Sequence, residues 1–245
     1  MQPVIPLWIT LLTVATNIAV PLLAWLAFQR VARRSARSLV APSFVFFALW
    51  LVLAFTLSAR GFFAGSGRSS FPSIAWALVP LVAGYLGYLM LRPARAVVDQ
   101  IPLQWVIGLQ FYRVLGVVFL VEWMLGAVPG AFALPAGIGD VVIGLTAPFV
   151  AARIREGAPG AREAAIRWNV LGIADLVVAV TLGVLTTPGP LQLLALGASN
   201  VGLITLPLVL IPTIGVPFAL LLHLIGLHRL IGRGQQPMLG LSKAA

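Results

Sequence analysis

Long apolar blocks separated by short polar gaps run through the whole chain. A helix needs about 20 residues to cross the hydrocarbon core of a bilayer, and at a window of that size seven blocks stand out. They cover residues 7–28, 40–59, 73–91, 102–126, 134–152, 168–186 and 203–229. The pattern therefore predicts an all-α, polytopic transmembrane helix bundle. All gaps between blocks are short, so we expect one transmembrane domain over residues 1–245 and no separate soluble domain.

The last block is the least regular of the seven. The apolar run over residues 191–230 is too long for one span and has no polar break. Pro207, Pro212 and Pro217 are expected to kink it, because proline interrupts helical hydrogen bonding. The stretch LQLLALGA, residues 191–198, is a candidate for a short interfacial or re-entrant helix. An arrangement with eight spans therefore stays open.

Composition strengthens the membrane interpretation. The chain is 60% hydrophobic and 9% charged, with a mean hydropathy of +1.05, whereas soluble domains carry about 25% charged residues. The net charge is +10, but the basic residues lie between the apolar blocks, so we expect contact with membrane lipid and no nucleic-acid partner. The absence of cysteine excludes disulfides, thiolate catalysis and iron–sulfur clusters.

The basic residues also predict the orientation. One set of loops carries Arg30, Arg33, Arg34, Arg37, Arg92, Arg95, Arg153, Arg155, Arg162, Arg167, Arg229, Arg233 and Lys243. The opposite loops carry Arg60 and Arg68. The positive-inside rule therefore places the N-terminus outside and the C-terminus in the cytoplasm. The preference for arginine, alanine, glycine and proline indicates a bacterial protein of the plasma (inner) membrane. Six tryptophans near span ends are typical of an aromatic belt: Trp8, Trp25, Trp76, Trp105, Trp123 and Trp168.

Several polar residues fall inside the apolar blocks, where ionisable groups are costly and usually functional. We expect a substrate or ion pathway lined by Arg113, Asp140, Asp175, Gln110, Asn169 and His223. Glu122 and Asn17 are also intramembrane.

Arg113 needs a counter-ion. Glu122 follows nine residues later, on the opposite face of an α-helix and about 13 Å further along it, so we expect it at the solvated outer end of the span. Asp140 and Asp175, in the next two spans, are the plausible partners. Counted from the predicted span ends, they should lie in opposite leaflets with Arg113 between them in depth.

Both aspartates are predicted to lie on packing faces. Small residues recur at helical spacing around each: Gly137, Gly144, Ala147 and Ala151 around Asp140, and Gly172, Ala179 and Gly183 around Asp175. Such stripes let membrane helices approach closely. The segments GIGDVVIGLT (137–146) and GIADLVVAVT (172–181) also resemble one another and cross in opposite directions, as inverted repeats in transporters do. Ten residues are too few to establish a duplication.

Familiar cofactor and catalytic patterns do not fit. The residues GIGD match the Gly-x-Gly-Asp pattern of intramembrane aspartyl proteases, but the preceding span offers Arg113 in place of an aspartate, so we take the match as coincidence. Lys243 lies beyond the last span, which disfavours a retinal Schiff base. His223 and His228 diverge by about 140° on one helix and cannot both ligate one haem. We expect no cofactor and no metal.

Three functional classes remain. The first is a transporter for a small molecule, an ion or protons, using a buried Arg–Asp site. The second is a non-catalytic helical subunit or scaffold, in which the cluster only fixes helix packing; a homo-oligomer or a membrane-protein partner is possible. The third is a membrane-embedded enzyme or sensor for a lipid or a small apolar ligand, with Asp175 and His223 as an acid–base pair. No reaction-specific constellation supports an enzyme. We favour the first class, because charged and amide side chains gather on small-residue faces and the carboxylates are expected in both leaflets.

Overall fold

The computed structural model describes residues 5–64, 75–198 and 200–232, and all regular elements among them are helical. The long helices are α1 (Leu7–Ser35), α2 (Val40–Ala59), α8 (Gly130–Glu156), α9 (Ala161–Thr186) and α10 (Val216–Gly232). The shorter helices are α4 (Leu78–Met90), α5 (Arg92–Gln100), α6 (Leu103–Gly108) and α7 (Val117–Met124). Four 3₁₀ segments are η1 (Arg37–Leu39), η2 (Phe62–Ala64), η3 (Leu109–Gly116) and η4 (Gly202–Ile204), and η5 (Ile211–Gly215) is a π segment.

Six helical stretches among the described residues are long and apolar enough to cross a membrane. They are Leu7–Ser35, Arg37–Ala59, Leu103–Met124, Gly130–Glu156, Ala161–Thr186 and Ile211–Gly232. The predicted span over residues 73–91 corresponds to the 13-residue helix α4, and its first two residues lie outside the described ranges. The all-helical class is confirmed, and the six stretches are compatible with a multi-pass membrane protein.

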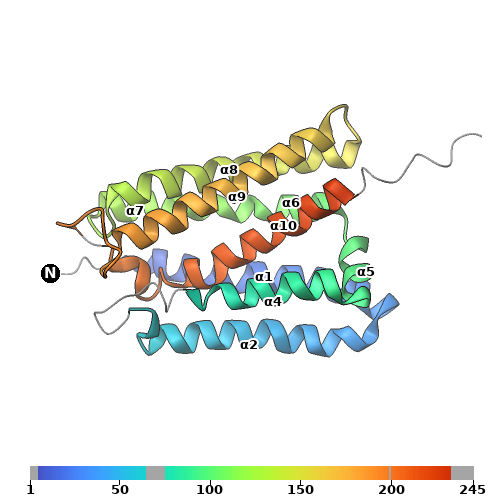
Figure 1. Cartoon of the computed structure of the whole chain (residues 1–245), viewed down its shortest axis with the longest axis horizontal. Coiled ribbons are helices and arrows are strands. Elements are labelled where there is room, and N and C mark those ends of the chain that lie inside the picture. The colour runs from blue at the N-terminus through green and yellow to red at the C-terminus, as the bar shows by residue number, and fades with distance from the viewer. Residues whose placement is uncertain (1–4, 65–74, 199, 233–245) are drawn as a thin grey trace, which may run out of the picture.

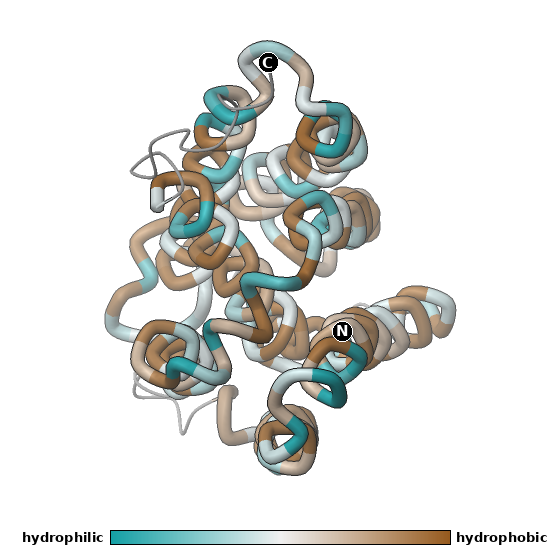
Figure 2. The backbone as a smooth tube through the Cα atoms, turned by 90° about the vertical axis from the view of Figure 1, so that its right-hand side faces the viewer, coloured by the Kyte–Doolittle hydropathy of each residue, from teal (hydrophilic) through white to brown (hydrophobic). Residues whose placement is uncertain are grey.

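Most helices run along one axis, and α5 lies across one end of the bundle (Figure 1). Helices α8 and α9 pack side by side, and α10 lies between this pair and the layer of α1 and α4. Figure 2 looks along the bundle and shows hydrophobic residues on the outlying helices too. On α2, Leu49 and Val52 are 55% and 59% exposed. Large exposed apolar side chains of this kind suit a lipid environment rather than water.

A tight turn makes α8 and α9 antiparallel neighbours. Gly157 ends α8 with φ +61° and Gly160 precedes α9 with φ +69°, a left-handed conformation that glycine adopts without a Cβ clash. The amide of Ala158 donates to the carbonyl of Arg153 at 3.0 Å, which closes the helix end. This turn, α5 and the C-terminal ends of α1 and α10 lie at the same end of the bundle (Figure 1). The described arginines of the loops that were predicted to be cytoplasmic thus gather at one end of the bundle. Arg68, from the opposite set of loops, lies outside the described residues.

The segment before α10 differs from its prediction. Residues 191–198 form turns and no helix, and apart from the short η4 the long helical stretch of the last predicted span starts only at Ile211, with η5. Pro207 and Pro212 have no amide hydrogen to donate, so a continuous helix cannot start earlier without losing hydrogen bonds. The predicted interfacial helix was therefore wrong, and the expected irregularity takes the form of the π segment that contains Pro212.

Four of the six tryptophans predicted for the aromatic belt are exposed. Trp8, Trp76, Trp105 and Trp123 are 53%, 62%, 56% and 41% exposed, as an aromatic belt requires. Trp168 was predicted in the same belt, but it is buried, with its Nε1 donating to Thr146 Oγ1 at 2.9 Å and its ring 5.1 Å from that of His223. It lies eight residues inside α9, because this helix starts at Ala161, well before the predicted span.

The contact between Trp50 and Thr213 yields a stability prediction. Buried Trp50 on α2 donates its Nε1 hydrogen to the Thr213 carbonyl in η5 at 3.0 Å. We expect Trp50→Phe to lower the free energy of unfolding by about 1 kcal/mol or somewhat more, because a buried carbonyl loses its side-chain donor. Thermal unfolding of the purified protein in detergent measures this. The matched change Trp76→Phe, at an exposed site, should leave the midpoint unchanged; equal midpoints for both variants would contradict the role of the bond.

Candidate functional site

Arg113 occupies a 3₁₀ segment in the middle of a membrane-length helical stretch. Helix α6, η3 and α7 together span Leu103–Met124, and η3 covers Leu109–Gly116. A 3₁₀ segment of eight residues is long, because such runs rarely exceed three or four residues and often mark a functional site or strain. Arg113 itself is only 3% exposed. The segment thus carries a buried guanidinium into the space between α8, α9 and α10.

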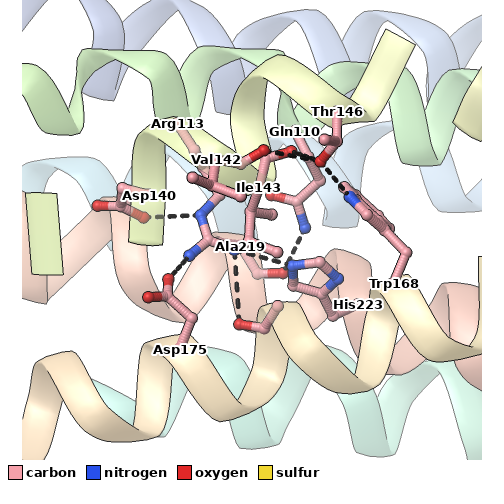
Figure 3. A network of polar contacts seen from close by, with 12 residues as sticks. Gln110, Arg113, Asp140, Val142, Ile143, Thr146, Trp168, Asp175, Ala219 and His223 are labelled. Carbon is pink, nitrogen blue, oxygen red and sulfur yellow. Dashed lines mark hydrogen bonds and ion pairs between the residues drawn. The ribbon is translucent and has the colours of Figure 1, made fainter. Parts of the chain in front are cut away.

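Two carboxylates bind that guanidinium (Figure 3). The Nε of Arg113 donates to Asp140 Oδ1 on α8 at 2.7 Å, and Nη2 forms an ion pair with Asp175 on α9. The prediction that these aspartates lie in opposite leaflets was wrong. Asp140 is the eleventh residue of α8 from Gly130, and Asp175 is the twelfth of α9 counted back from Thr186, so the antiparallel helices place them at one depth.

The third guanidinium nitrogen connects Arg113 to His223 on α10. Nη1 lies 3.0 Å from His223 Nε2 and 3.5 Å from the Gly172 carbonyl. A guanidinium only donates, so Nε2 must accept and the proton of the neutral ring lies on Nδ1. Nδ1 is 2.9 Å from Asn169 Oδ1, and the Asn169 amide donates to the Ala165 carbonyl at 2.8 Å. The donors and acceptors therefore form one consistent chain from Ala165 to Arg113.

Gln110 lies beside this network without bonding to its side chains. Its Nε2 donates to the Ala219 carbonyl of α10 at 2.9 Å, and its Oε1 has no hydrogen-bond partner among the described residues. Tyr112, which sequence reasoning did not select, donates its hydroxyl to the Gly215 carbonyl at 2.8 Å. The structure thus joins five of the six predicted site residues directly and places Gln110 next to them.

Three glycines allow the helices to approach closely enough for these contacts. A Cβ on Gly116 would collide with Asp140, one on Gly139 with the Asp175 carboxylate, and one on Gly172 with the His223 ring. Gly172 belongs to a predicted small-residue stripe, and both stripes are largely buried. Gly116 and Gly139 were missed. The doubled glycine of the GIGD stretch was the available signal for Gly139.

The aspartates lie at the edge of the cluster, and Asp140 borders empty space. Their side chains are 15% and 14% exposed, against 2% for the Arg113 side chain. A cavity of about 50 Å³, here named the central cavity, is lined by Arg113, Asp140, Gly116, Tyr112, Thr13 and Asn17 among others. Most of its wall is apolar, but the side chains of Arg113, Asp140, Thr13 and Asn17 offer polar partners, and a cavity of this size has room for water. A second cavity, of about 130 Å³ and mostly apolar, also reaches Asp140.

Glu122 is not the solvated carboxylate that the sequence predicted. Its exposed fraction is 0%, and neither of its carboxylate oxygens has a hydrogen-bond partner among the described residues. The prediction assumed a uniform α-helix, whereas η3 turns by about 120° per residue and so changes the faces on which later residues lie. As predicted, Glu122 does not pair with Arg113.

The acid–base pair considered for an enzyme is not formed. Asp175 and His223 contact different nitrogens of Arg113, and His223 Nε2 is occupied as an acceptor. Within the described ranges, no three His, Cys, Asp or Glu side chains converge in a way that suits a metal ion. The cluster is organised around a guanidinium.

The fold and the cluster define a class: a helical bundle with membrane-length apolar helices and a buried, arginine-centred polar site. Residues 71–231 match a protein family described as a domain of unknown function (DUF8737), and the chain belongs to this family. The matched region contains all six predicted site residues. No curated protein and no solved structure matches the chain.

The close approach at Gly139 yields a second stability prediction. We expect Gly139→Ala to lower the free energy of unfolding by about 1–3 kcal/mol, because the new methyl group must displace the Asp175 carboxylate from Arg113. Gly87→Ala, in α4, meets nothing within 4 Å and should be neutral or stabilising by up to about 1 kcal/mol. Thermal unfolding of both variants in one detergent compares them. A Gly139→Ala protein as stable as Gly87→Ala would show that the helices separate freely.

Proposed function

We propose that the protein is a membrane transporter in which the cluster of Arg113, Asp140 and Asp175 binds and releases a proton in the course of transport. The observation that carries this proposal is the charge balance of the cluster. One guanidinium faces two carboxylates, and His223 is neutral in the observed hydrogen-bond arrangement. One excess negative charge in an apolar bundle is costly, and uptake of one proton cancels it.

Access to the site supports the same function. Asp140 borders both the central cavity and the second, apolar cavity, so its carboxylate is reachable from two spaces, whereas Arg113 borders the central cavity alone. Water in the central cavity would connect Asp140 to neighbouring polar groups such as Thr13 and Asn17. A carboxylate that is ion-paired with an arginine but still borders a cavity is suited to exchange protons.

The arginine-rich end of the bundle supports an orientation. By the positive-inside rule, we place α5, the α8–α9 turn and the C-terminal end of α10 in the cytoplasm, and the N-terminal end of α1 outside. We infer a multi-pass protein of a bacterial inner membrane, surrounded by lipid. A homo-oligomer or a membrane-protein partner stays a prediction.

Proton flux in proteoliposomes tests the function. With an internal pH-sensitive dye and an imposed membrane potential, the wild type should acidify or alkalinise the lumen faster than empty liposomes. Asp140→Asn and Asp175→Asn should each slow this flux by at least about tenfold, because each removes a proton-accepting carboxylate. Glu156→Gln, at an exposed carboxylate outside the cluster, is the matched control. Equal flux in wild-type and empty liposomes would refute the proposal.

A second candidate function, a structural scaffold, is favoured by the saturation of Arg113. All three of its nitrogens have partners, and these partners come from α8, α9 and α10. On this alternative the cluster locks four segments together and moves nothing. Removing one member of a buried ion pair is costly because the remaining charge is left uncompensated.

Neutralising the cluster stepwise separates the two functions. Arg113→Gln should lower the free energy of unfolding by about 3–5 kcal/mol, since two carboxylates lose their counter-ion. The triple change Arg113→Gln, Asp140→Asn and Asp175→Asn should recover much of this loss, because no buried charge remains. Thermal unfolding and proton flux are measured on the same preparations. If the protein is a transporter, the wild type should conduct protons and the folded triple variant should not. If the wild type and the triple variant show the same background flux, the scaffold is indicated.

A further inference from the structure

Glu122 is a buried carboxyl group whose surroundings the polar cluster does not explain. It shares its face of α7 with Val118 and Phe119, which belong to a buried apolar cluster together with Ile9 and Leu208. Neither carboxylate oxygen accepts a hydrogen bond, and no described arginine, lysine or histidine forms an ion pair with it from any helix. An isolated carboxylate ion in such a place is costly, so this arrangement suits the neutral acid.

Glu122 lines neither of two empty spaces itself, but the residues before and after it on this stretch line one space each. Val118 and Phe119, about one helical turn before it, line the central cavity beside Arg113. Trp123 and Gly126, directly after it, line a larger hollow of about 1020 Å³. This end hollow lies at the N-terminal end of α1, with Ile5, Thr10, Ala127 and Thr205 in its wall.

Helix α1 carries polar side chains along both spaces. Thr10 lines the end hollow, and Thr13 and Asn17 line the central cavity. Spacings of three and four residues put these side chains on one helix face. The Thr13 hydroxyl is buried and has no hydrogen-bond partner among the described residues. It is therefore available to hold water in the central cavity.

We propose that Glu122 is a proton-binding group that relays protons between the end hollow and Asp140. This inference rests on the proposed transport function and extends it by naming a route. In the inward step, the neutral acid of Glu122 gives its proton, through water of the central cavity, to the Asp140 carboxylate. The resulting Glu122 carboxylate takes a proton from hydronium in the end hollow. One proton moves per step, no electron is transferred and no covalent bond between heavy atoms changes.

The test compares Glu122→Gln with Glu122→Asp and Glu156→Gln in the proteoliposome assay. The amide of Gln is close in shape to a neutral carboxyl group but cannot release a proton, so flux should fall by at least about tenfold. Asp keeps an ionisable group and should restore part of the flux, while Glu156→Gln should behave as wild type. Thermal unfolding should give midpoints for Glu122→Gln and the wild type that agree closely, because Gln and the neutral acid of Glu122 are both uncharged.

Infrared spectroscopy gives a readout that does not depend on flux. The difference spectrum of wild type minus Glu122→Gln should contain the C=O band of a protonated carboxyl group, and bands of a carboxylate in its place would overturn the proposal. A conducting wild type with equal flux in Glu122→Gln overturns the relay but leaves the transport function intact. A wild type without flux overturns the transport function and the relay with it. If Glu122→Gln fails to fold, Glu122→Asp takes its place in both measurements. Slowed flux together with a protonated carboxyl band that shifts between wild type and Glu122→Asp supports the relay, and wild-type flux together with carboxylate bands in that difference spectrum refutes it.

Discussion

The contact between one guanidinium and two carboxylates is the interaction on which the centre of this bundle depends. Arg113 is almost fully buried, so its charge is tolerable only because Asp140 and Asp175 meet it from α8 and α9. The meeting requires short distances between helix backbones. Glycines at positions 116, 139 and 172 supply them, because any side chain there would occupy the space of an aspartate or of His223. The close packing of the helices and the compensation of the buried charge therefore depend on each other.

The same contact orders the groups around it. Because a guanidinium has no acceptor, it fixes the tautomer of His223, and the histidine in turn fixes the orientation of the Asn169 amide. The segment resemblance between residues 137–146 and 172–181 gains a physical meaning here, since the matched aspartates bind neighbouring nitrogens of one side chain. Whether or not these segments arose by duplication, the antiparallel hairpin of α8 and α9 brings equivalent positions to equal depth.

The sequence allowed the helical class, the small-residue faces and the partners of Arg113 to be predicted, because apolar block length and helical spacing are local properties. The depth of Asp140 and Asp175 could not be predicted the same way. It depends on where α9 starts, and α9 includes a charged first turn before the apolar block that marked the predicted span. The prediction for Glu122 was wrong for a related reason: the faces on which the residues after η3 lie depend on how η3 is wound, and the prediction assumed a regular α-helix there. The helix predicted over residues 191–198 was wrong because an apolar composition alone does not distinguish a helix from turns.

The unusual winding of η3 has a mechanical consequence. A 3₁₀ segment rises about 2.0 Å per residue and an α-helix about 1.5 Å, so rewinding these eight residues as α-helix would shorten the segment by about 4 Å. It would also turn Arg113 about the helix axis relative to the ends of the stretch, because the two kinds of helix differ by about 20° per residue. Opposite η3, the π segment η5 is wound more loosely than an α-helix, and its Gly215 carbonyl accepts the hydroxyl of Tyr112. The overwound segment η3 and the underwound segment η5 thus face each other at the level of the buried charge. The ion pairs of Arg113 hold η3 at its present length.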